Sequence, residues 1–327
     1  MDFRLNEDQQ ALRAGIRDFC EGRVGTDQLR ELEGERSVDA ALWSELAEMG
    51  VFSLRQPESR GGVGLGAADA VVVFSELGRR LVPGPLVWTH LAAGFVEGAG
   101  AGAAVVGGID AADGGQQPWL VEHFDRLDAL LVLRPDAVEL VDPKRVAAKS
   151  AGLPLDPHTP LHLLDSLPRG ERVGDAGASR QLRLEGAALV AAQLLGIAEA
   201  TTELATDYAK RREQFGRPIG SFQALKHMLA DMFVRQEVAR AAVYAAGATL
   251  DDPLVGDVAL AVASAKIVAG EAALKNARAC IQIHGGMGYT WEIPAHYYLK
   301  RAWVCENLFG TVDEHADRVA ESVGRRA

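Results

Sequence analysis

The chain has 327 residues, 48% of them hydrophobic and 24% charged, and these proportions are ordinary for a globular protein with a substantial core. The formal net charge of −11 argues against a nucleic-acid partner, because contacts to a phosphate backbone require clustered lysine and arginine. The three cysteines, Cys20, Cys280 and Cys305, are scattered and lack metal-ligand spacing, so we expect a reducing compartment and no metal site.

The N-terminal segment, MDFRLNEDQQALRAGIRDF, is charged and amphipathic and lacks the apolar core of a signal peptide. The longest uncharged stretch, Leu81–Val96, is interrupted by the sequence Pro-Gly-Pro and is too short to span a bilayer comfortably. We therefore expect a cytoplasmic protein without a membrane span.

Residues 1–100 have a helical pattern. Asn6 is placed to cap a first helix, because it precedes two acidic residues and a run of apolar residues at helical spacing. A second helix is expected over Asp39–Met49 and a third over Ala67–Leu81, with the glycine-rich loop Ser59–Gly66 before the third.

Residues 101–183 change in character. Short apolar runs alternate with Gly, Pro and Asp, which is typical of strands and turns. We interpret this segment as a small, degenerate β-domain. The expected strands are Ala103–Val106, Ala129–Leu133, Ala137–Val141 and Leu161–Leu164.

Residues 184–327 are again helical. Three alanine-rich amphipathic helices are expected over Ala188–Arg211, Phe222–Leu250 and Leu254–Ile283, and a fourth over Pro294–Cys305 or the C-terminal tail. The whole chain is thus predicted to be mainly α with a small β-domain. Its order is an N-terminal helical domain (1–100), a β-domain (101–183) and a C-terminal four-helix bundle (184–327).

Three stretches are more specific than a generic helical bundle. They are YAKRREQFGRPIGSFQALKHMLADM (208–232), QIHGGMGYTWEIP (282–294) and VCENLFGT (304–311). Their order and spacing resemble the acyl-CoA dehydrogenase family of flavoproteins, and the resemblance covers most of the chain. It implies α,β-dehydrogenation of an acyl-CoA thioester, in which a carboxylate removes the Cα proton and FAD accepts the hydride.

The resemblance also implies which residues contact FAD. In relatives, the first two stretches reach across a subunit interface to the pyrophosphate and adenosine. An arginine can form charge-assisted bonds to pyrophosphate, and paired glycines let backbone amides approach it closely. The positions that match the family's cofactor contacts are Arg212, Gln214, Phe215, Gln282, Gly285, Gly286 and Thr311. The neighbouring aromatic residues Tyr289, Trp291 and Tyr297 are instead expected to pack between helices.

The catalytic base of the family has no match in this chain. Many relatives carry it as the glutamate of a Tyr-Glu-Gly-Thr motif, and here Phe309 occupies that position before Gly310 and Thr311. A second branch of the family carries the base on the helix that precedes the Arg-x-x-Phe-Gly stretch, at the position that corresponds to Gly186. Glu185 is one residue away, which on a helix rotates the side chain by about 100°. Glu185 is therefore a weak candidate base, and a charge in the first turn of a helix, favoured by the helix dipole, explains it better.

The β-segment also departs from the family pattern, since the loops and strands that hold the flavin ring in the same subunit have no match. Some steroid-degrading bacteria build acyl-CoA dehydrogenases from two unlike subunits as α2β2, and this chain resembles their shorter, base-less subunit. The resemblance implies a catalytic partner subunit, a shared FAD and a bulky acyl-CoA such as one with a steroid side chain. Two alternatives stay open: a self-sufficient dehydrogenase that uses Glu185, and a non-enzymatic binding or scaffold protein.

Overall fold

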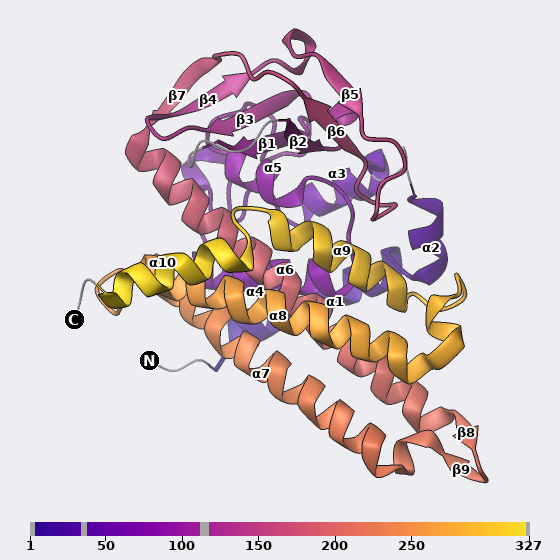
Figure 1. Cartoon of the computed structure of the whole chain (residues 1–327). Coiled ribbons are helices and arrows are strands. Elements are labelled where there is room, and N and C mark those ends of the chain that lie inside the picture. Colours follow the sequence, from indigo (N-terminus) through magenta and orange to yellow (C-terminus); the bar gives the residue numbers. More distant parts are fainter. Residues whose placement is uncertain (1–3, 34–37, 112–117, 325–327) are drawn as a thin grey trace. The chain divides into compact units, whose positions relative to one another are not determined.

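The computed structural model describes residues 4–33, 38–111 and 118–324 (Figure 1). By internal packing the chain divides into two compact units. We call Met1–Thr26, Val71–Val82 and Ala187–Ala327 the bundle unit, and Asp27–Ala70 and Pro83–Gly186 the sheet unit. The division into three consecutive domains expected from the sequence stays a prediction.

The sheet unit contains two small sheets, in which the longest strands have five residues. In the larger sheet, in the order β1-β3-β4-β7, β1 and β3 are parallel and the other pairs are antiparallel. The smaller sheet is antiparallel, in the order β2-β6-β5. The strands are β1 (Val106–Asp110), β2 (Trp119–Glu122), β3 (Ala129–Leu133), β4 (Ala137–Val141), β5 (Ala148–Ser150), β6 (Leu161–Leu164) and β7 (Glu171–Asp175).

The inward-facing residues of both sheets form one apolar core that includes Val121, Leu130 and Val141. Three of the expected strands are confirmed with the bounds given by their apolar runs. The expected strand Ala103–Val106 was wrong, because only Val106 of this run belongs to a strand, β1. The helices of this unit are α2 (Thr26–Glu31), α3 (Ala40–Glu48), α5 (Leu86–Ala92) and the first part of α4 (Ala67–Arg79).

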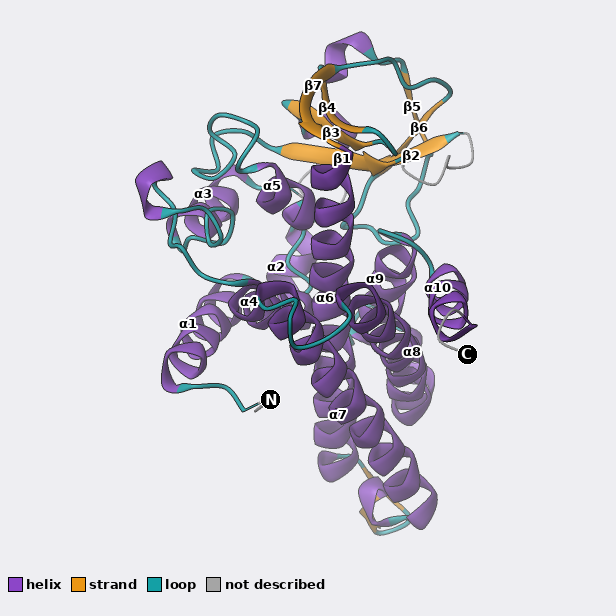
Figure 2. Cartoon of the chain, turned by 90° about the vertical axis from the view of Figure 1, so that its left-hand side faces the viewer, coloured by secondary structure: helices purple, strands orange, loops and turns teal. Residues whose placement is uncertain are grey.

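The bundle unit is built from long helices (Figure 2). Asn6 caps the first of them, as expected, and accepts a hydrogen bond from the backbone of Gln9. Both α9 and α10 pack against α8, so the two candidates for a fourth helix each contribute to the bundle. Its helices are α1 (Glu7–Arg23), the later part of α4, α6 (Ala176–Arg211) from Ala187 onward, α7 (Gln223–Asp251), α8 (Val258–His284), α9 (Ala295–Asn307) and α10 (Val312–Gly324).

Helix α6 begins at Ala176, well before the expected start at Ala188. Its first turns are polar and carry no apolar period, and Asp175 caps them by accepting a hydrogen bond from the backbone of Ala178 at 2.8 Å. This is the one described helix with the length and apolar composition of a membrane span, and 89% of its most apolar window is buried inside the protein. It is therefore a core helix.

Helices α4 and α6 cross in direct backbone contact at two glycines. A Cβ atom at Gly78 would lie 2.2 Å from the carbonyl oxygen of Gln193, and one at Gly196 would lie 1.9 Å from that of Ser75. Because no side chain fits in that space, both positions require glycine. The crossing brings Arg79, at the end of α4, close to Glu199, which lies within α6.

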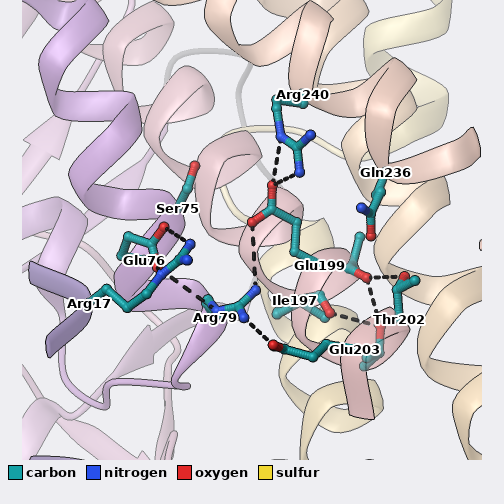
Figure 3. Close-up of polar contacts among 12 residues, drawn as sticks. Arg17, Ser75, Glu76, Arg79, Ile197, Glu199, Thr202, Glu203, Gln236 and Arg240 are labelled. Carbon is teal, nitrogen blue, oxygen red and sulfur yellow. Dashed lines mark hydrogen bonds and ion pairs between the residues drawn. The ribbon is translucent and has the colours of Figure 1, made fainter. Parts of the chain in front are cut away.

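A chain of ion pairs continues from this crossing through the bundle unit (Figure 3). Arg17 of α1 pairs with the buried Glu76 of α4 at 2.6 Å. Glu199 of α6 lies between Arg79, at 3.9 Å, and Arg240 of α7, at 2.7 Å. The network thus links four helices, and its partly buried charges are all paired.

Candidate functional site

The first motif forms a hairpin that extends past the ends of α6 and α7 (Figure 1). Strands β8 (Glu213–Gln214) and β9 (Arg217–Pro218) pair across the two-residue turn Phe215-Gly216. Both turn residues have positive φ, 54° and 75°, as a type I′ turn requires. Phenylalanine is an unusual residue for the first of these positions, because its Cβ strains the left-handed conformation.

The side chains of this hairpin face outward. Phe215 is 88% exposed, and its ring makes an edge contact with Phe222 at 6.1 Å. Arg217 lies over the other ring, with its guanidinium carbon 4.2 Å from the centroid of Phe222. Arg212 and Gln214 are exposed, and among the described residues neither side chain has a hydrogen-bond or ion-pair partner. The tip therefore presents an unpaired guanidinium, an amide and an aromatic ring to whatever lies beyond it.

The local charge of this tip is opposite to that of the whole chain. Residues 208–227 contain five lysines and arginines and one acidic residue, although the full chain carries −11. A basic patch of this kind attracts anionic groups such as phosphates.

The second motif lies at the C-terminal end of α8. Gln282, Gly285 and Gly286 are exposed. Gly285 has φ 61° and ψ −138°, a conformation open in practice only to glycine. Gly286 differs, because it has no positive φ and a Cβ atom there would meet nothing within 4 Å. Nothing within the described chain therefore requires glycine at position 286, and close approach of an external group would explain it.

A ring stack joins the two motifs. Tyr208, four residues before Arg212, stacks on His284, which precedes Gly285, with centroids 4.2 Å apart and planes inclined by 25°. Burial lowers the pKa of His284, so the imidazole is neutral at pH 7. The structure thus brings the two predicted cofactor-binding stretches to one end of the bundle.

The prediction that the nearby aromatic residues pack between helices is correct for one of three. Tyr297 is fully buried, whereas Tyr289 is 79% exposed and Trp291 is 57% exposed. Tyr289 ends the short 3-10 helix Gly285–Tyr289, and Trp291 lies in the turn before α9. Periodicity cannot detect their exposure, because segments this short carry no apolar period.

The third stretch ends in a left-handed turn. Phe309 has φ 57° and Gly310 has φ 98°, and Phe309 is buried with 4% of its surface exposed. The turn is held through its backbone by surrounding side chains. The contacts are Lys266 Nζ to Gly310 O at 2.7 Å, His315 Nε2 to Phe309 O at 3.0 Å, Thr311 N to Glu314 Oε2 at 2.7 Å and Val312 N to Glu306 Oε1 at 2.9 Å.

Two of the residues that hold this turn were not identified from the sequence. Lys266 is fully buried, and burial lowers its pKa to about 8, although Glu306 partly offsets the effect. Burial, together with the charges of Lys266 and Arg318, lowers the pKa of His315 to about 4. His315 is therefore neutral at pH 7, and its Nε2–H donates to the Phe309 carbonyl. The sequence signal that could have identified Lys266 is its place inside the apolar run Val262–Gly270, where a lysine is unexpected.

Thr311 has a local structural role. It precedes α10, and its hydroxyl accepts a hydrogen bond from the backbone of Glu314, while the Glu314 carboxylate accepts from the backbone of Thr311. This reciprocal pair is a capping box. The cap is sufficient to explain a threonine at this position, and its assignment to a cofactor stays a prediction.

The weak candidate base Glu185 is already paired. Its carboxylate lies 2.6 Å from Arg55 and accepts a hydrogen bond from Gln181 at 2.8 Å. Helix α6 is continuous through this position, so the backbone irregularity that would turn Glu185 toward the direction of Gly186 is not present. Among the residues that the structure describes, no group of three or more His, Cys, Asp or Glu is arranged to hold a metal ion.

Comparison with known proteins identifies the family. Residues 6–101 match the family described as "Acyl-CoA dehydrogenase, N-terminal domain" and residues 178–324 match "Acyl-CoA dehydrogenase, C-terminal domain". The chain is 36% identical to the acyl-CoA dehydrogenase IpdE2 of Mycobacterium tuberculosis, over 97% of this chain and 98% of that protein.

Solved structures share the fold. A chain of the ChsE4-ChsE5 complex of Mycobacterium tuberculosis superimposes with a TM-score of 0.86 at 26% identity and 99% coverage of both chains. A chain of the Tcur3481-Tcur3483 "steroid ACAD" superimposes with a TM-score of 0.81 at 24% identity and 98% coverage of both. The predicted mainly helical fold with a small sheet region is confirmed. This chain belongs to the acyl-CoA dehydrogenase family, a family of oxidoreductases.

Proposed function

We propose that this chain is the base-less subunit of an FAD-dependent acyl-CoA dehydrogenase that is built from two unlike subunits. The observation that carries the proposal is Phe309. It occupies the position of the family's glutamate, in a left-handed turn whose backbone is held by Lys266, His315, Glu306 and Glu314. The turn is firmly held while its side chain cannot accept a proton, which supports a base supplied by another chain.

The exposed residues of the first two motifs fit an FAD that is held by a second subunit. Arg212 would form a charge-assisted bond to the pyrophosphate, and the amides at Gly285 and Gly286 would approach it closely. Gln214 and Gln282 would supply amide hydrogen bonds, while the exposed ring of Phe215 would cover an apolar surface. The open space at Gly286 and the unpaired Arg212 support this assignment. When bound, FAD supplies the oxidation of the Cα–Cβ bond of the acyl thioester.

The likeness to a chain of the ChsE4-ChsE5 complex supports a heteromeric assembly, because that structure holds two differently named subunits. The likeness to a steroid acyl-CoA dehydrogenase supports a bulky acyl group, such as a steroid side chain, as the substrate class. The α2β2 stoichiometry and the cytoplasmic location are part of the same proposal.

The test is the flavin content of the isolated and the assembled chain. The tagged chain is purified from its native host, and a co-purifying acyl-CoA dehydrogenase subunit is identified by mass spectrometry and co-expressed. We expect about one FAD for each unlike pair and none for the chain alone. A chain that binds stoichiometric FAD and oxidises an acyl-CoA by itself would overturn the proposal.

The two alternatives give different results in the same preparation. A self-sufficient enzyme with Glu185 as its base predicts turnover by the isolated chain and loss of turnover in Glu185→Gln. The ion pair between Arg55 and Glu185 weighs against it. A scaffold protein predicts an assembled complex that contains no flavin.

A further inference from the structure

The exposed aromatic residues that precede α9 gather around one lysine. Trp291 is 57% exposed and Tyr289 is 79% exposed. The ammonium nitrogen of Lys300 lies over the indole of Trp291, 4.7 Å from the ring centroid. We call Tyr289, Trp291 and Lys300 the aromatic cluster. Because large exposed aromatic side chains that gather in one place mark a binding surface more often than a packing defect, the cluster calls for a ligand.

Local structure holds the indole of Trp291 in place. Its ring meets the ring of His296 edge-on, with centroids 4.7 Å apart and planes at 83°, and its centroid lies 5.8 Å from that of Tyr297. His296 and Tyr297 are buried in the first turn of α9. Lys300 lies one turn later, and because helical side chains lean toward the N-terminus of their helix, it reaches back over Trp291. The indole is therefore oriented in advance, which lowers the entropy cost of stacking a ligand on it.

The charge of Lys300 is available to a ligand. Its ammonium group lies over the rings of Trp291 and Tyr297, the second at 5.9 Å, and among the residues that the structure describes it has no hydrogen-bond or ion-pair partner. With histidines neutral, residues 282–303 carry Lys300 and Arg301 against Glu292, a net charge of +1 (two minus one) in a chain of −11. An ammonium group in such surroundings attracts a phosphate.

The aromatic cluster adjoins the second cofactor-directed motif. The 3-10 helix that begins at Gly285 ends at Tyr289, and this short helix contacts α9. Gly285 and Gly286 are exposed, so an open stretch of backbone, a ring and a cation follow one another at this end of the bundle unit. An adenine nucleotide has the complementary groups, since a flat base can stack on an indole and phosphates bind ammonium groups and backbone amides.

We propose that the aromatic cluster binds an adenine nucleotide, with the base stacked on Trp291 and a phosphate paired with Lys300. FAD and the coenzyme A part of an acyl-CoA both contain an adenosine diphosphate group, so either can supply this ligand. The choice of these two sources rests on the proposed function. The stacking surface itself rests on the geometry of Trp291 and Lys300.

The test compares tryptophan substitutions in the full chain, assembled with the co-purified acyl-CoA dehydrogenase subunit. Trp291→Leu removes the stacking ring, and Trp291→Phe keeps one. Trp303→Leu is the matched control, because Trp303 is a second tryptophan beside a cation, with the guanidinium carbon of Arg278 5.9 Å from its ring centroid. We expect the dissociation constant of FAD or of coenzyme A to rise at least about fivefold in Trp291→Leu. Trp291→Phe should keep most of the affinity, and Trp303→Leu should change it less than about twofold.

Titration of each ligand separates the two sources. A rise for FAD alone assigns the aromatic cluster to the cofactor, and a rise for coenzyme A alone assigns it to the substrate. Lys300→Met should weaken the same ligand as Trp291→Leu. Its control is Lys275→Met, which removes a half-exposed ammonium group that pairs with Glu271 on α8.

Circular dichroism shows whether each variant folds, and Lys300→Met decides the test if Trp291→Leu does not. Unchanged dissociation constants of both ligands in the folded variant overturn the inference. A complex that dissociates in Trp291→Leu, measured by analytical ultracentrifugation, also overturns it, because the ring then contacts protein rather than a nucleotide. A wild-type complex without FAD refutes the proposed function, and the inference is then decided by coenzyme A alone.

Discussion

The ammonium nitrogen of Lys266 donates to the carbonyl oxygen of Gly310 at 2.7 Å and to that of Glu306 at 2.8 Å. One buried charge in the middle of α8 therefore fixes both the end of α9 and the turn that contains Phe309. The cation also lies at the C-terminal end of a helix, where the helix dipole favours it. The turn that contains Phe309 is thus anchored to α8 by a buried cation.

Replacement of Lys266 by methionine should destabilise the chain. The change keeps the volume but leaves the carbonyl groups of Glu306 and Gly310 buried without their donor. We expect a loss of roughly 2–4 kcal/mol in the free energy of unfolding, measured by urea denaturation. Lys275→Met on the same helix is the control, because Lys275 is half-exposed and its ion pair with Glu271 is worth little. Equal stability of the two variants would contradict the role of Lys266.

His315 should make the chain sensitive to acid. Its pKa in the folded state is lowered to about 4, from 6.5 in the unfolded state, so the unfolded chain binds more protons between these values. The stability that the neutral imidazole contributes is present above pH 6.5 and is lost as the pH falls toward 4. The loss is at most about 3 kcal/mol. In His315→Gln, the part of the pH dependence of unfolding in this window should be absent, and an unchanged pH profile would show that His315 does not cause it.

The crossing of α4 and α6 should not tolerate even one methyl group. Gly196→Ala places a Cβ atom 1.9 Å from the carbonyl oxygen of Ser75, so the helices must separate. We expect a destabilisation of about 3 kcal/mol or more by thermal or urea unfolding. Gly15→Ala in α1 is the matched control, because its Cβ atom meets nothing within 4 Å, and it should stabilise by about 0.5–1 kcal/mol. Similar effects at the two positions would mean that the helices are not in backbone contact.

Gly286→Ala separates cofactor binding from folding. A Cβ atom at this position meets open space, so the unfolding free energy of the chain should change by less than about 0.5 kcal/mol. The FAD content of the assembled complex should fall, because the added methyl group keeps the backbone from close contact with the pyrophosphate. Absorbance of the flavin relative to protein measures this, and Gly22→Ala, also in open space, is the control. Full flavin content in Gly286→Ala would remove this glycine from the site.

The elements and motifs that could be predicted from the sequence are those marked by nearby residues, through residue type or periodicity. The cap at Asn6 and the strands Ala129–Leu133 and Ala137–Val141 follow from residue type and period. The start of α6 was missed because its first turns depend on the Asp175 cap rather than on apolar spacing. The long-range partners of the Phe309 turn could not be predicted, since Lys266 is more than 40 residues away and nothing local pairs them. The Arg55–Glu185 ion pair was missed for the same reason.

The two compact units are interleaved along the chain. The bundle unit takes its residues from three separate segments, including Met1–Thr26 and Val71–Val82, and the 36-residue helix α6 contributes to both units. No single truncation of the gene would therefore yield either unit intact. The two units therefore depend on one continuous chain, and neither can be prepared separately by shortening it from one end.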